Sequence, residues 1–150
     1  MVLNLTIFLM IKQHIILDNY QWEIDIYYAI HGYYVDEIVK NLVSIGIRGK
    51  KLLKAKELLE EGKVNTGLTY VKNGKAVCVI GKASSAAQYA DSLQHEAMHL
   101  AIFIAQEEEI PLDSEEVCYI GGEIARKMHP KSKYLTSECG CYTYKIGKVL

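Results

Sequence analysis

The stretch AAQYADSLQHEAMHLAIFIAQ, from Ala86 to Gln106, is the most informative part of this 150-residue chain for both its fold and its candidate site. No Gly or Pro interrupts it, and Ala, Leu, Gln and Met, which have high helix propensity, are frequent in it. Ser84 or Ser85 can accept a backbone N–H bond at its start. The sequence therefore predicts a long helix. Because apolar residues lie on nearly every side of it, we expect this helix to be buried at the centre of the fold.

This helix contains the pattern His95-Glu96-Ala97-Met98-His99, or H-E-x-x-H. Residues four apart lie one turn apart on the same face, so the two histidines can bring imidazole nitrogens to one point, about 2 Å from a Zn²⁺ ion. Glu96 projects beside such an ion, where a carboxylate can take a proton from a metal-bound water. The alternative is a set of satisfied core residues without a metal. Because two histidines and a glutamate in a buried helix are costly unless something pairs with them, we predict one zinc ion here.

A catalytic zinc site usually has three protein ligands, so a third must come from elsewhere in the chain. Residues 113–129 predict the next helix, with acidic residues favoured in its first turn. We expect Glu116 to be the third ligand, with Tyr119 one turn away and Glu123 nearly two turns away on the same side. Glu115 is the nearest alternative ligand. Glu123 fits better as an acceptor from a histidine N–H, or as the ligand itself if Glu116 points away. The competing interpretation is that all these acids lie on the surface at a helix start.

The rest of the chain predicts two hairpins and two further helices, and therefore an α+β fold in one domain covering residues 1–150. Asn73-Gly74 lies between two β-rich runs, which is typical of a hairpin with a type I′ turn. The predicted strands cover residues 14–18, 22–30, 68–72 and 76–80, and the predicted helices cover residues 36–44 and 50–61.

The last predicted helix has two features that bear on its packing and its length. Gly121 and Gly122 in a helix interior each cost about 1 kcal/mol relative to Ala, which close approach of the H-E-x-x-H helix would explain. We expect Pro130 to end this helix. Residues 1–13 are interpreted as a leader or an edge strand, with Met10 as an alternative start, and residues 130–150 as a tail.

Composition narrows the function and the compartment. The net charge is −1, so nucleic acid is a poor candidate partner. The apolar first residues are too short to span a bilayer, which needs about 20 residues, and they lack the features of a secretory signal. The four cysteines are expected to be free thiols, and Cys139-Gly140-Cys141 to be two thiols in a turn, because a second pair of zinc ligands is missing. We therefore expect a cytoplasmic protein that does not bind a membrane.

The segment HEAMHLAIFIAQEEEIPLDSEEVCYIGGEIA resembles the zincin metallopeptidases of the Glu-ligand type, in which a second helix gives a glutamate ligand. It is most similar to short phage- and prophage-associated zincin-like proteins with a Glu-Glu-x-x-Tyr pattern after the motif. The resemblance covers about residues 66–129. It implies a small zincin-like domain with a mostly antiparallel sheet. It also implies that residues 68–80, with Val77 and Val79 as contacts, border a cleft for a peptide or protein substrate.

The function expected from these residues is zinc-dependent peptide hydrolysis. Zinc lowers the pKa of its water towards about 7. Glu96 takes the proton as the water attacks the scissile carbonyl, and then passes it to the leaving amine. Tyr119 or a tyrosine of the tail can stabilise the oxyanion. The alternative is a zinc-stabilised binding or structural module that kept the site without catalysis.

Overall fold

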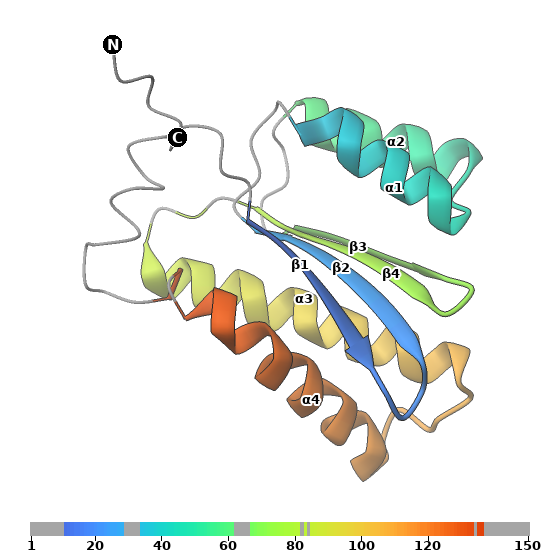
Figure 1. Cartoon of the computed structure of the whole chain (residues 1–150), viewed down its shortest axis with the longest axis vertical. Helices are drawn as coiled ribbons and strands as arrows, with labels where there is room; N and C mark the ends of the chain where they lie inside the picture. Colours follow the sequence, from blue (N-terminus) through green and yellow to red (C-terminus); the bar gives the residue numbers. More distant parts are fainter. Residues whose placement is uncertain are drawn as a thin grey trace.

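The strands and helices follow the predicted order (Figure 1). The computed structural model describes residues 11–28, 34–61, 67–81, 83, 85–133 and 135–136. Residues 1–10 of the predicted leader or edge strand, and most of the predicted tail with its two cysteines, lie outside the described residues. The elements are β1 (Ile11–Leu17), β2 (Trp22–Tyr28), α1 (Val35–Ile45), α2 (Gly49–Glu60), β3 (Gly67–Lys72), β4 (Lys75–Ile80), α3 (Ala86–Glu107) and α4 (Glu115–Ser132).

The strands form one mixed four-stranded sheet in the order β1-β2-β4-β3. β1 and β2 pair as an antiparallel hairpin, and so do β3 and β4. The two hairpins meet through a parallel pair, in which Ile24 of β2 lies opposite Ala76 of β4. The α+β class and both predicted hairpins are therefore confirmed. β4 is a central strand with neighbours on both sides, whereas β3 is an edge strand.

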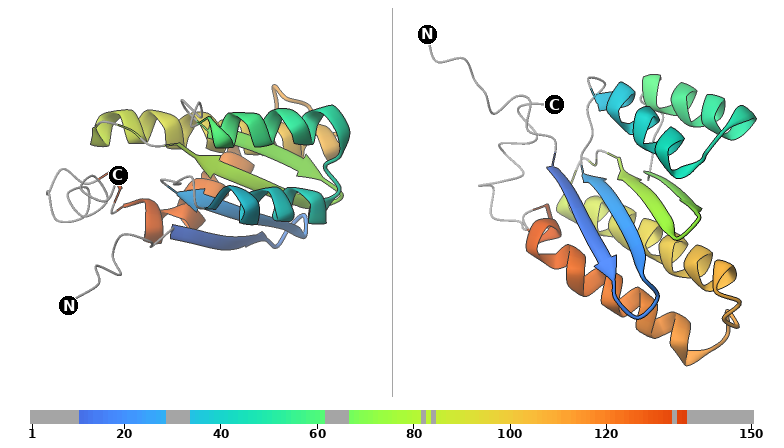
Figure 2. Two further views of the ribbon diagram at one scale, coloured as in Figure 1. Left: turned by 90° about the horizontal axis from the view of Figure 1, so that it is seen from above. Right: turned by 45° about the vertical axis from the view of Figure 1, so that its right-hand side comes forward.

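The alternation along β2 supplies two separate cores. Trp22, Ile24 and Ile26 point to the face covered by α3 and α4. Tyr27 points to the opposite face, where it packs with Val77 and residues of α1 and α2. Because successive strand residues face opposite sides, both faces of the sheet bury apolar area. The result is three layers, with the sheet between two pairs of helices (Figures 1 and 2).

Local signals in the sequence set the start of α3. Asn73 and Gly74 both have positive φ, 53° and 75°, as the type I′ turn between β3 and β4 requires. Ser85, in extended conformation, accepts a hydrogen bond from the backbone N–H of Gln88 at 3.1 Å, and so caps α3. A tight hairpin therefore leads almost directly into the helix that carries the histidines.

α3 packs against β3 and β4, while α4 packs against β1 and along the side of α3. α4 continues through Pro130 to Ser132, so the prediction that Pro130 ends it was wrong. A proline this close to the end of a helix removes one hydrogen bond of the last turns, which costs less than the same loss in the interior.

Close packing against α3 does not require the glycine pair of α4, so the expected close approach of the two helices does not explain it. A Cβ added at Gly121 would lie 3.7 Å from the Cβ of Ala101, an ordinary contact. A Cβ added at Gly122 would meet nothing within 4 Å. Both positions have room for alanine.

No described helix combines the length and the hydrophobicity that crossing a bilayer requires.

Candidate metal centre

His95 and His99 lie one turn apart on α3 and bring their rings together. Their Nε2 atoms are 3.1 Å apart, and their ring centroids are 4.7 Å apart at an angle of 75°. His99 also stacks on Phe103, one turn further along, with centroids 5.3 Å apart. His95 is exposed and His99 is half-buried, so the paired nitrogens lie at the surface of the helix.

The distance between these nitrogens fits a shared zinc ion. Two imidazole nitrogens, each about 2.05 Å from zinc at a tetrahedral angle, are about 3.3 Å apart. The observed separation of 3.1 Å is close to that value. Without an ion, the same contact is a hydrogen bond that needs one donor and one acceptor nitrogen. Imidazole is also among the nitrogen ligands that zinc prefers, so the donor set fits the ion.

Glu96 completes the group and is deeply buried. One ligand atom from each of His95, Glu96 and His99 lies within 4.8 Å of the others. Glu96 is 2% exposed, and its Oε2 accepts a hydrogen bond from Thr69 Oγ1 on β3 at 2.5 Å. The motif residues are thus brought together, with the glutamate between the helix and the edge strand.

α4 packs against a face of α3 that lies next to the face carrying the histidines. Ala97 and Ala101 line the groove that α3 forms with α4. Glu96, by contrast, contacts β3. His99 is three residues after Glu96, so it lies on the same side of the helix, towards β3. Met98 and Ile102, each three residues after a histidine, line the same groove, so the histidines lie between the rim of this groove and β3.

This arrangement corrects the expectation that Glu116 is the third ligand. Glu116 is absent from the group formed by the histidines within the described residues. Its Oε1 instead accepts a hydrogen bond from Tyr20 Oη at 2.5 Å, in the turn between β1 and β2. Glu115, the alternative ligand, begins α4 as an exposed residue and is also outside the group. Both acids are therefore surface residues at a helix start.

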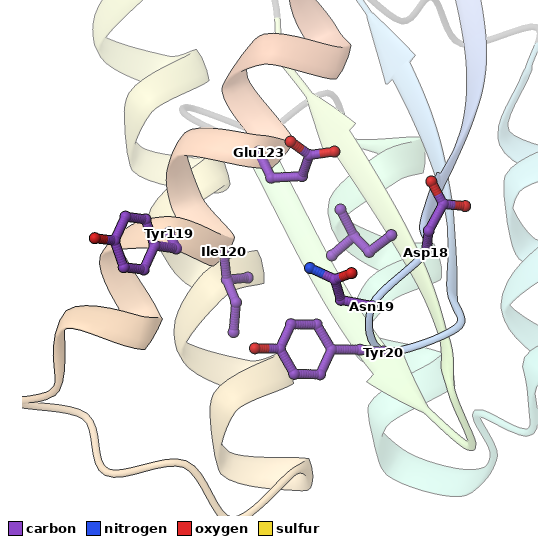
Figure 3. A pocket seen from close by; sticks show the side chains of 7 residues that line it. Asp18, Asn19, Tyr20, Tyr119, Ile120 and Glu123 are labelled. Carbon is purple, nitrogen blue, oxygen red and sulfur yellow. The ribbon is translucent and has the colours of Figure 1, made fainter.

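Tyr119 and Glu123 belong to a different group of side chains, which contains neither His95 nor His99 (Figure 3). They line a cavity of about 170 Å³ between α4 and the turn that contains Asp18, Asn19 and Tyr20. Tyr119 is 70% exposed there, which is a correction to its role as an oxyanion donor.

Glu123 accepts no hydrogen bond from any histidine that the structure describes, contrary to the prediction. Its carboxylate binds Arg126 at 2.7 Å, and Lys127 lies 3.6 Å away. The hydrogen bond from Arg126 is the main cause that lowers the pKa of Glu123. The Glu123 carboxylate therefore pairs with residues of its own helix, α4.

Val77 and Val79 are not substrate contacts, for a reason of strand geometry. Both point to the face of the sheet that α1 and α2 cover, and each is 1% exposed. They also belong to β4, which has neighbours on both sides. Among the described strands, the edge strand next to Glu96 is β3, most of which lay within the predicted 68–80 segment.

Two residues of the site were missed by sequence reasoning. Thr69 contacts Glu96, and a Cβ on Gly67 would lie 2.8 Å from Glu96 Cγ. A signal was present, because counting back by twos from the Asn73-Gly74 turn places Gly67 and Thr69 on one face of the strand.

Comparison of the chain with known protein families, curated proteins and solved structures finds no significant match.

Proposed function

We propose that this protein is a zinc-dependent peptidase in which His95 and His99 hold the ion and Glu96 is the general base. The observation that supports it most is the convergence of these side chains: two Nε2 atoms 3.1 Å apart, with a buried carboxylate in the same 4.8 Å group. A zinc ion bound there would activate water at neutral pH and polarise a carbonyl oxygen.

In this proposal Glu96 transfers the proton and β3 binds the substrate. Glu96 is held against β3 next to the histidines, so it can take a proton from water and deliver it to the leaving amine. β3 lies at the edge of the sheet beside Glu96, where an extended peptide can add as a further strand through backbone hydrogen bonds. The proposed substrate is therefore a peptide or an extended protein segment.

The test is hydrolysis of a broad peptide library by untagged, zinc-loaded protein. Glu96→Gln should keep one zinc ion and the fold, because the amide occupies the same space, and should lose activity by about 10²-fold or more. Glu115→Gln removes an exposed carboxylate away from the histidines and should leave the rate unchanged. Cleavage by Glu96→Gln at the wild-type rate, or no cleavage by the wild type, would contradict the proposal.

The same group of atoms favours a second candidate, a zinc-stabilised binding module without catalysis. Glu96 is the one carboxylate grouped with the histidines in the described part of the chain, so it can be a ligand instead of a base. In that case Glu96→Gln would weaken zinc binding and no peptide would be cleaved. Zinc affinity of this variant, measured by calorimetry, separates the two functions.

A further inference from the structure

The buried Glu96 carboxylate has one hydrogen-bond partner in the described part of the chain, Thr69 on β3. The Thr69 Oγ1 atom lies 2.5 Å from Glu96 Oε2. The glutamate side chain is 2% exposed. Burying a carboxylate away from water is costly unless a donor forms a hydrogen bond with it, so the Thr69 hydroxyl offsets much of the desolvation cost of Glu96. The other oxygen, Oε1, has no partner among the described residues and is available for chemistry.

Within the described part of the chain, the hydroxyl proton of Thr69 has two possible acceptors, and distance and charge both favour the glutamate. Cys78 Sγ lies 3.6 Å from Thr69 Oγ1, which is further than the carboxylate oxygen. Complete burial raises the pKa of the Cys78 thiol to about 12, so it is a neutral and weak acceptor. A carboxylate forms the stronger, charge-assisted bond. Thr69 therefore donates to Glu96.

Gly67, two residues earlier on the same face of β3, makes room for this contact. A Cβ at that position would lie 2.8 Å from Glu96 Cγ and 2.9 Å from Glu96 Cδ. Any larger residue would push the carboxylate away from β3. Gly67 thus leaves space for the Glu96 side chain, and Thr69, two residues later on the same face of β3, donates a hydrogen bond to it.

We infer that Thr69 is a positioning residue, whose hydroxyl fixes one oxygen of Glu96 against β3 and so directs the other oxygen to the space beside His95 and His99. This role in hydrolysis rests on the proposed function, whereas the fixed position of the carboxylate does not.

The first test uses infrared spectroscopy and needs no substrate. The carboxylate band of Glu96 is isolated as the difference between wild type and Glu96→Gln. In Thr69→Val, which keeps the shape and removes the hydroxyl, the band should shift, and in Thr69→Ser it should stay at the wild-type position. Thr136→Val, the same substitution at a threonine that bonds within its own turn, should leave the band unchanged. An unchanged band in Thr69→Val, or a shift of the same size in Thr69→Ser, overturns the inference.

The second test uses the kinetics of peptide hydrolysis. Thr69→Val should lower kcat by about 10-fold or more with KM within about 2-fold, as is usual for groups that orient catalytic side chains, and Thr69→Ser should restore kcat. Wild-type kcat in Thr69→Val, together with a shifted band, overturns the role in hydrolysis. If the wild type cleaves nothing, the proposed function fails, and the infrared comparison alone decides whether Thr69 holds the carboxylate.

Discussion

Replacing Gly67 by alanine should destabilise the protein far more than a Gly-to-Ala change elsewhere. The added Cβ would lie 2.1 Å from the backbone carbonyl oxygen of Val79, whereas ordinary contact begins at 3.4 Å. β3 and β4 would have to move apart by about an ångström at the Gly67–Ile80 pair, because a carbonyl of a central strand cannot rotate away. The same Cβ also presses on the Glu96 side chain, so two neighbours must shift together.

The magnitude follows from the cost of overpacking. Inserting a group into a filled interior costs about 1–3 kcal/mol, occasionally more. Because the obstacle is a backbone atom, we expect Gly67→Ala to lower the free energy of unfolding by an amount at the upper end of this range, about 3 kcal/mol. At this chain length each kcal/mol lowers Tm by about 2–4 °C, so the midpoint should fall by about 6–12 °C.

Urea unfolding followed by Trp22 fluorescence measures this loss, since Trp22 is the single tryptophan and is 2% exposed. Gly122→Ala is the matched control, because its Cβ meets nothing within 4 Å and alanine favours a helix interior by about 1 kcal/mol. We expect this control to be as stable as the wild type or more stable. A Gly67→Ala variant within about 0.5 kcal/mol of the wild type would refute the close approach of β3 to Glu96.

Two further predictions concern titration and thiol reactivity. Burial acts to raise the pKa of Asp25, but hydrogen bonds from Asn41 and His14 outweigh it, so the pKa in the folded state lies below the ordinary value. The ionised Asp25 therefore stabilises the fold above about pH 4, and this stabilisation is lost as the pH falls through the folded-state pKa. The wild type should therefore exceed Asp25→Asn in urea midpoint near neutral pH, with the gap closing in acid, and a gap independent of pH would contradict this. Cys118 is exposed and Cys78 is buried with its pKa raised to about 12, so peptide mass mapping after brief alkylation of the native protein should find Cys118 modified and Cys78 intact. Modification of Cys78 at a similar rate would disprove its burial.

The features predictable from sequence are those set by short-range spacing. The pairing of His95 and His99 follows from the helical repeat, and their Nε2 atoms do meet. The turn at Asn73-Gly74 and the cap at Ser85 depend on a few adjacent residues, and both are confirmed.

Whether Glu116 reaches the histidines could not be predicted, because that depends on how α4 packs against α3 and the sheet. A periodic pattern places Glu116 on a face of α4 but carries no information about the position of α4 relative to the histidines. Glu116 pairs with Tyr20, which is 96 residues away in sequence, and such a contact is visible only in the folded chain.

The substrate strand was ambiguous for a related reason. From Ala76 to Ile80, β4 is apolar at every position, since both of its faces are buried, so alternation could not tell Val77 from Cys78. The parallel pairing of β2 with β4 made β4 central and left β3 at the edge. A long-range contact of the acidic run after α3 was likewise not predictable from the sequence: Glu108 accepts a hydrogen bond from Trp22 Nε1 at 2.7 Å.

Metal content is the decisive measurement for the zinc site at His95 and His99. Untagged protein is purified without added metal and dialysed against trace zinc, and its zinc content per chain is measured by elemental mass spectrometry. His129→Ala, an exposed histidine on α4, is the control for His95→Ala and His99→Ala. We expect one zinc ion per chain in the wild type and in His129→Ala, and loss of that ion in each of the other two variants. A wild type without zinc, or zinc that persists after His95 and His99 are both replaced, would contradict this expectation.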